Sequence, residues 1–148
     1  MGTQELKRTD WDIRLMSYID DVRNEPFQWG VHDCLTFANG ATTAQCGSGF
    51  ADDCLLCEYE TPRGALLKFH RWMRANDYSD IVEAVDDRLN RIYAKFLPRG
   101  AIVGMPQASN DVLPFSFGVS IGQHCAFVAA KGLIFLKPRS DFLCWGLE

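Results

Sequence analysis

Hydrophobic residues recur every three or four positions through the first two thirds of the chain, and this spacing is typical of amphipathic helices. The first helix is predicted by five apolar residues that share one face: Trp11, Leu15, Tyr18, Ile19 and Val22. Thr9 is its expected N-cap, and Asp12 three residues later completes a capping-box pattern. We expect this helix to end before Pro26, because proline disfavours helical backbone in the residue that precedes it.

A second helix is predicted to begin at about Asp33 and to end where Gly47 and Gly49 interrupt it. Its apolar residues include Leu35, Phe37 and Ala38. In this reading Cys34 lies in the first turn of the helix.

Two further helices are predicted before residue 100. Thr61 followed by Pro62 indicates the start of the third helix, because threonine caps helices and proline suits their first turn. Its expected apolar face comprises Leu66, Phe69 and Met73, widened by Trp72. The fourth helix is expected to be capped by Ser79 and to be stopped by the Leu-Pro-Arg-Gly run at 97–100. Its expected inward side chains are Ile81, Val85, Leu89 and Ile92.

After Gly100 the hydrophobic period changes to two, which is typical of β-strands. Five strands are predicted, over residues 101–105, 115–121, 125–130, 133–136 and 142–145. Helices followed by strands, without alternation, indicate an α+β fold with N-terminal helices packed on a C-terminal antiparallel sheet. Because no linker or repeat divides the chain, we expect a single domain over residues 1–148.

Composition and charge narrow the classes of function. The 148 residues are 47% hydrophobic and 23% charged, which favours a folded domain over disorder. The net charge of -4 argues against a general nucleic-acid binder, because such proteins need excess Lys and Arg to neutralise phosphates. No stretch suits a membrane span, and no secretory signal pattern is present. Six irregularly spaced cysteines predict reduced thiols rather than a disulfide scaffold, in a protein made in a cytosol.

The segment Pro26-Phe-Gln-Trp-Gly-Val-His-Asp-Cys34 is the most informative stretch for chemistry. It forms a turn that places Cys34 at the start of a helix, where unpaired N–H groups and the helix dipole lower a thiol pKa. Cys34 is therefore a candidate nucleophile. Trp29 and Gly30 are expected to shape a tight, partly apolar approach to it, and Asp33 is expected to cap the helix. The alternative is a buried structural cysteine.

This segment resembles the NlpC-type cell-wall cysteine peptidases, in which a catalytic cysteine opens a helix after a Trp-Gly turn. The chain is more similar still to a family of small tailed-phage tail assembly or tail-tip proteins of NlpC-like fold. The similarity includes Trp11, Arg14 and Leu15 in the first helix, the segment Tyr59-Glu-Thr-Pro-Arg-Gly-Ala65, and the late strand from Gly132 to Phe135. The resemblance implies a papain-like fold, and partners among the other tail-tip proteins: the hub, the distal tail protein and the tape measure protein.

The same resemblance indicates that the catalytic partners are missing. The position of the general-base histidine in NlpC-type peptidases falls on Ser116, and the third polar residue falls near Val128. A cysteine without a base lacks the group that protonates the leaving amine. His124 could replace the base only if the turn after residue 121 folds back toward the cysteine. His32, two residues before Cys34, is the other candidate, or else packs within the turn.

Two further features could bind partners or metals. Cys46, Cys54 and Cys57 include a Cys-x-x-Cys pair, which can hold zinc or an iron–sulfur cluster, although complete sites need four ligands. The third helix has a positive polar side. Such a side is usually a solvated face, but it could instead meet an acidic surface of another tail protein. That side comprises Arg63, Lys68, His70, Arg71 and Arg74.

The sequence is therefore compatible with three functions. The first is a structural or assembly component of a bacteriophage tail tip, located in the virion tail and made in the bacterial host cytoplasm, with a degenerate papain-like site and no cofactor. The second is an active cysteine peptidase or amidase on peptidoglycan peptides, with Cys34 as nucleophile and His124 or a partner's residue as base. The third is a thiol-ligated metal or iron–sulfur module.

Overall fold

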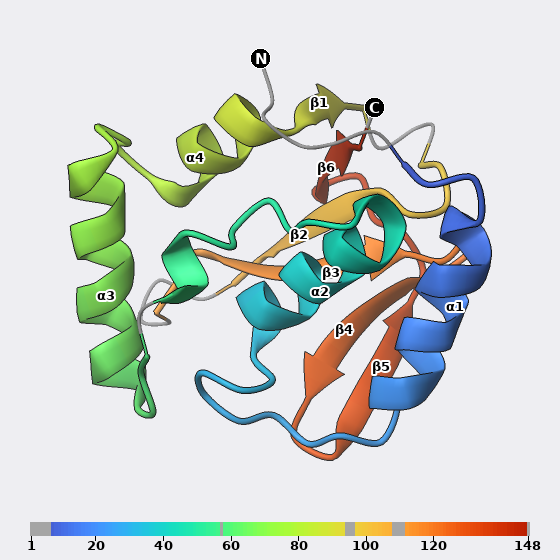
Figure 1. Ribbon diagram of the computed structural model, residues 1–148, viewed down its shortest axis with the longest axis horizontal. Coiled ribbons are helices and arrows are strands. Elements are labelled where there is room, and N and C mark those ends of the chain that lie inside the picture. The colour runs from blue at the N-terminus through green and yellow to red at the C-terminus, as the bar shows by residue number, and fades with distance from the viewer. Residues whose placement is uncertain (1–6, 57, 94–96, 108–111, 148) are drawn as a thin grey trace.

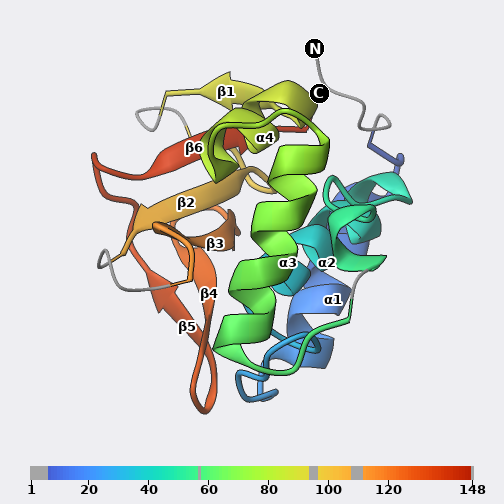
Figure 2. The ribbon, with the colours of Figure 1, turned by 90° about the vertical axis from the view of Figure 1, so that its left-hand side faces the viewer.

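The computed structural model describes residues 7–56, 58–93, 97–107 and 112–147. Helices and a sheet form two layers (Figures 1 and 2), and α2 lies over the sheet between α1 and α3 (Figure 1). The helices are α1 (Trp11–Val22), α2 (Cys34–Cys46), the 3-10 turn η1 (Cys54–Leu56), α3 (Pro62–Ala75) and α4 (Ile81–Arg88). The strands are β1 (Asn90–Ile92), β2 (Ile102–Pro106), β3 (Phe115–Ser120), β4 (Cys125–Ala129), β5 (Gly132–Leu136) and β6 (Leu143–Gly146).

The strands form one antiparallel sheet in the order β1-β6-β2-β3-β4-β5. Four helices before this sheet confirm the predicted α+β class. Among the described residues no helix is long and apolar enough to cross a membrane.

The helix α2 lies at the centre of the main hydrophobic core. Its side chains Leu35, Phe37, Ala38 and Ala41 are at most 1% exposed and pack among residues of α1, β3 and β4. Burial of apolar side chains is the main favourable contribution to folding. Because α2 is enclosed on several sides, its first residue is held firmly against the sheet.

Two of the four predicted helix N-caps hold. Asp33 caps α2 and Thr61 caps α3, as predicted. The prediction for α1 was wrong: its N-cap is Asp10 rather than Thr9, and Asp12 accepts a hydrogen bond from Ile13 N instead of completing a capping box.

The fourth helix is shorter than predicted and has a different cap. Asp80, not Ser79, accepts the hydrogen bond from Glu83 N, and α4 ends at Arg88. The next three residues form β1, so Ile92 lies opposite Cys144 of β6 rather than on a helix face. Pairing with a distant strand overrides the local helical period here.

One predicted core position of α3 was also wrong. Leu66 is 38% exposed, whereas Ala65 beside it is fully buried with Phe69 and Met73. The buried stripe of α3 therefore follows 65, 69 and 73, and the neighbouring Leu67 faces outward at 49% exposure.

The opposite face of the sheet carries a second, smaller apolar cluster. Its buried members are Val103, Cys125, Phe127, Phe142 and Cys144. Burial raises the pKa of Cys125 to about 12 and that of Cys144 to about 11. These two thiols are therefore core residues.

Candidate functional site

The turn before α2 has a conformation that only glycine adopts easily. Gly30 has φ of 79°, and a Cβ at this position would lie 2.0 Å from the carbonyl oxygen of Tyr59. L-residues disfavour this left-handed backbone, and the contact leaves no room for a side chain. Gly30 therefore allows the turn to lie directly against the segment before α3, as the predicted tight approach requires.

Asp33 joins this turn to α2 through both carboxylate oxygens. Its Oδ1 accepts from Thr36 N at 2.9 Å, and Thr36 Oγ1 accepts from Asp33 N at 2.7 Å, which completes a capping box. Its Oδ2 accepts from Gly30 N at 3.0 Å and from the Tyr59 hydroxyl at 2.6 Å. The carboxylate is 1% exposed, so these hydrogen bonds compensate for its lost hydration.

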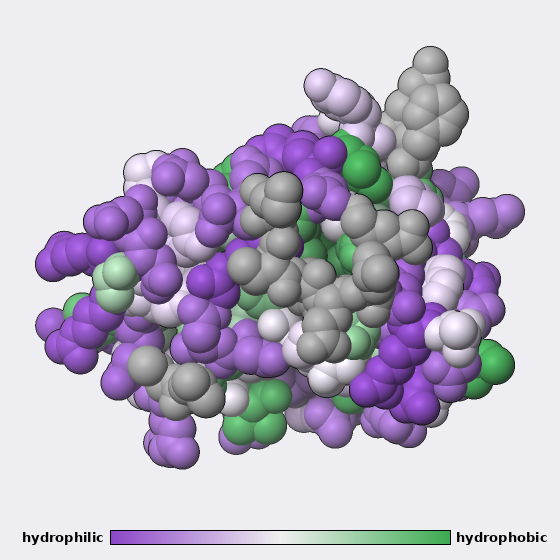
Figure 3. All heavy atoms as spheres, turned by 45° about the horizontal axis from the view of Figure 1, so that its top comes forward, coloured by the Kyte–Doolittle hydropathy of each residue, from purple (hydrophilic) through white to green (hydrophobic). Residues whose placement is uncertain are grey.

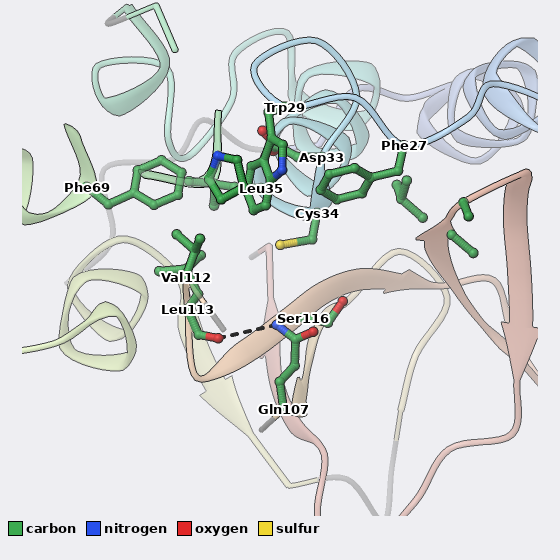
Figure 4. A pocket seen from close by; sticks show the side chains of 14 residues that line it. Phe27, Trp29, Asp33, Cys34, Leu35, Phe69, Gln107, Val112, Leu113 and Ser116 are labelled. Carbon is green, nitrogen blue, oxygen red and sulfur yellow. Dashed lines mark hydrogen bonds between the residues drawn. The ribbon is translucent and has the colours of Figure 1, made fainter. Parts of the chain in front are cut away.

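Cys34 is the first residue of α2, as predicted, and its sulfur points into a pocket between α2 and β3 (Figure 4). The pocket has a volume of about 540 Å³. Its apolar lining comprises Phe27, Trp29, Leu35, Pro62, Phe69, Val112, Leu113, Val128, Ala129 and Ala130. Its polar lining comprises Asp33, Cys34, Gln107 and Ser116. The site is therefore an apolar pocket with a thiol and a hydroxyl inside it.

The sheet opens beside Cys34. The β3–β4 ladder runs from Ser120 opposite Cys125 to Gly118 opposite Phe127, and the next pair in this register, Phe117 with Val128, is not formed. The backbone N–H of Phe117 lies near the Cys34 sulfur and lowers the pKa of this thiol. The cysteine thus faces β3 at the point where the ladder between the two strands ends.

Burial decides the ionisation of Cys34. The residue keeps some exposure, but its thiol is enclosed by protein, and this desolvation raises its pKa to about 12. Nearby Asp33 raises the pKa further, while the N–H groups of Phe117 and Leu35 and its own N–H lower it. The helix position was expected to produce a low pKa. That expectation was wrong because the apolar surroundings outweigh the backbone N–H groups.

The pocket brings together three positions that the resemblance aligned with catalytic residues. Ser116 and Val128 both line it with Cys34. None of the three histidines lies among the described residues that line this pocket. The pocket therefore presents a serine and a valine to the thiol at these two positions.

His124 does not reach Cys34. It lies in the turn between β3 and β4, where Ile121 N donates to its carbonyl oxygen at 2.9 Å. Ser116 lies near the opposite end of β3, four positions from Ser120, a distance of about 13 Å along the strand. The turn does not fold back toward Cys34, so the prediction of His124 as a substitute base was wrong.

His32 faces the core rather than the pocket. It is 4% exposed, its ring contacts Phe37 edge to face, and its Nδ1 lies 3.8 Å from a carboxylate oxygen of Glu25. Burial lowers its pKa, so the ring is neutral near pH 7. His32 thus has the packing role that was the alternative to catalysis.

The predicted thiol-rich site is only partly described. Cys46 and Cys54 are buried at the end of α2 and in η1, and Cys57 lies outside the described residues. Within the described ranges no group of three His, Cys, Asp or Glu side chains could hold a metal ion. The assignment of a metal to the full set of three cysteines stays a prediction.

Sequence reasoning missed Tyr59 and Gln107 as site residues. Tyr59 supplies the hydroxyl bound to Asp33, and Gln107 Nε2 donates to Leu113 O at 3.3 Å at the pocket wall (Figure 4). Tyr59 lay within the Tyr-x-Thr segment of the resemblance, which was a usable signal. Gln107 follows β2 and carries no local pattern that marks it.

A comparison with protein-family models matches residues 6–146 to the family described as "Domain of unknown function (DUF6950)". No curated protein and no solved structure matches the chain. The family match spans the turn, the helix and the strands that form the pocket. The chain therefore belongs to the DUF6950 family.

Proposed function

We propose that this protein is a structural or assembly component of a bacteriophage tail tip, with a papain-like pocket that has lost its catalytic partners. The observation that carries the proposal is the lining of one pocket by Cys34, Ser116 and Val128. The resemblance predicted these three positions to meet, although α2 lies far from β3 and β4 in sequence. Their convergence supports the papain-like relationship, and their identities support loss of activity.

The pocket is poorly equipped for hydrolysis. A cysteine nucleophile needs a thiolate and a group that protonates the leaving amine, and proton transfer of this kind contributes about 10²–10⁴-fold. The thiol of Cys34 has a raised pKa, and Ser116 cannot act as a base near neutral pH. The apolar walls are better suited to holding a segment of a neighbouring tail protein than to cleaving it.

A second function is favoured by the position of Cys34 itself. A core thiol needs no pocket, yet Cys34 lines one of about 540 Å³. If a partner in the tail supplied a base, the protein would be a cysteine peptidase or amidase acting on peptidoglycan peptides. The thiol-ligated metal module is a third function, and elemental analysis of the purified protein tests it: absence of bound metal removes it.

The deciding experiment compares phages that carry Cys34→Ala, Cys125→Ala or a deletion of the gene. Under the assembly proposal, the deletion abolishes tail formation, whereas Cys34→Ala gives intact, infectious particles. Cys125→Ala is the matched control, because it removes another buried thiol outside the pocket. Intact tails with lost infectivity in Cys34→Ala alone would favour the enzyme. Tails that form normally without the gene would contradict the assembly proposal.

A further inference from the structure

The outer face of α3 is a cationic surface with an apolar centre. Leu67 is 49% exposed at the middle of this face, and the exposed Arg63, Arg71 and Arg74 surround it. No ion pair engages these three arginines within the described part of the chain. These arginines are therefore not neutralised by any carboxylate among the described residues.

The outer face of α1 has the opposite charge, and it too has an exposed apolar side chain at its centre. Ile13 is 70% exposed, and a surface hollow beside it is bordered by Asp12, Asp20 and Asp21. The hollow also includes Met16, Ser17 and one cation, Arg99. Asp20 pairs with Arg23, whereas Asp12 and Asp21 have no cationic partner within the described ranges.

These two faces lie at opposite ends of the molecule. In Figure 1, α3 forms one end of the longest axis and α1 forms the other. Hydrophilic side chains cover both ends in Figure 3, with a small hydrophobic patch within each. Because the two faces lie at opposite ends, the cationic face of one copy can contact the anionic face of a second copy that has the same orientation.

We infer that copies of this chain associate head to tail, with the α3 face of one copy on the α1 face of the next. Leu67 packs against the hollow beside Ile13, and the arginines of α3 meet Asp12 and Asp21. Two α3 faces cannot pair with each other, because their arginines repel. This inference rests on the surface charge and on the two exposed apolar side chains, and it is independent of the proposed role of the Cys34 pocket.

The head-to-tail arrangement has two physical consequences. A head-to-tail contact leaves one free face at each end, so assembly continues into a ring or a filament rather than stopping at a symmetric dimer. Exposed ion pairs are individually weak and are screened by salt, so the association is reversible and salt-dependent.

The test is sedimentation of the purified full chain at low and high salt, up to about 1 mM protein, the range of weak complexes. We expect species larger than a dimer at low salt, and association weaker by about tenfold or more at high salt. Arg71→Glu/Arg74→Glu and Asp12→Lys/Asp21→Lys should each abolish the association. The quadruple variant, which reverses both faces and keeps the net charge of the natural chain, should restore it.

Lys131→Glu/Lys137→Glu is the matched control, because it changes the net charge as much as the α3 variant but alters exposed positions outside both faces. It should associate like the natural chain. All the substituted side chains are exposed, so each variant should fold. Thermal melting checks that each one does. The inference is overturned if the natural chain stays monomeric, if the quadruple variant does not recover, or if only the α3 variant loses association. The last result would assign the α3 face to a different acidic partner.

Discussion

The hydroxyl of Tyr59 donates a 2.6 Å hydrogen bond to Oδ2 of Asp33, and both residues are buried. This contact ties the segment before α3 to the first turn of α2, 26 residues earlier in the chain. Burial, together with the adjacent carboxylate, raises the pKa of Tyr59, so the phenol stays protonated and continues to donate. The position of Cys34 against the sheet depends on this contact as well as on its own helix.

Tyr59→Phe should lower the free energy of unfolding by about 1–3 kcal/mol, because a buried carboxylate oxygen loses a charge-assisted hydrogen bond. Urea denaturation measures the change. Tyr93→Phe is the matched control, since Tyr93 is 87% exposed and should show almost no effect. Equal stabilities of the two variants would mean that the Tyr59 hydroxyl contributes nothing.

Gly30→Ala should be among the most damaging single changes in the turn. The added Cβ would meet the Tyr59 carbonyl oxygen, and alanine is strained at φ of 79°. We expect a loss of about 2–4 kcal/mol of stability, measured by thermal or urea denaturation. Gly146→Ala serves for comparison, because its Cβ would lie 3.7 Å from the nearest atom, an ordinary contact. If Gly30→Ala is tolerated equally well, the close approach is not structurally required.

The thiol of Cys34 should react slowly with iodoacetamide. With the pKa raised to about 12, thiolate is scarce at pH 7.5, and we expect alkylation on the order of a hundredfold slower than for an exposed cysteine. Mass spectrometry of the peptide that contains Cys34 follows the reaction between pH 6 and pH 10. A plateau reached below about pH 8 would instead reveal an activated thiolate and favour the enzyme.

Stability should decline at alkaline pH. A thiol in the unfolded chain ionises near its ordinary pKa of 9.0, whereas the folded chain keeps Cys34 protonated up to about 12. The stabilisation from this difference is complete below pH 9 and is lost as the pH rises from 9 toward 12. Cys34→Ala should therefore show a shallower decline of the unfolding free energy in this range. Parallel curves for the natural chain and the variant would contradict the raised pKa.

Ser116→His should activate the thiol if the pocket has papain-like geometry. An imidazole on β3 at this position would face Cys34 and lower its pKa, so alkylation at pH 7 should accelerate by about tenfold or more. Ser116→Asn is the matched control, because it adds similar bulk without a base. Equal rates in the two variants would show that position 116 cannot serve the thiol, and the papain-like alignment would fail.

The sequence by itself determined the features that depend on neighbouring residues. Helix caps act over three or four residues, so Asp33 and Thr61 identified the starts of α2 and α3, and with them the place of Cys34. Strand alternation is also local, and it located β2 to β6 to within one or two residues. The sequence pattern did not predict β1, because its three residues form a strand only through pairing with β6.

Only the tertiary structure decided the chemistry of the site. The pKa of Cys34 depends on what encloses its sulfur, and the surrounding atoms come from α2, β3 and distant loops that local sequence does not bring together. The hydrogen bond from Tyr59 and the N–H of Phe117 likewise join segments that meet only after the chain has folded. Desolvation and hydrogen bonding act through space, so a thiol with the expected helix position has the opposite ionisation to the one that position predicts.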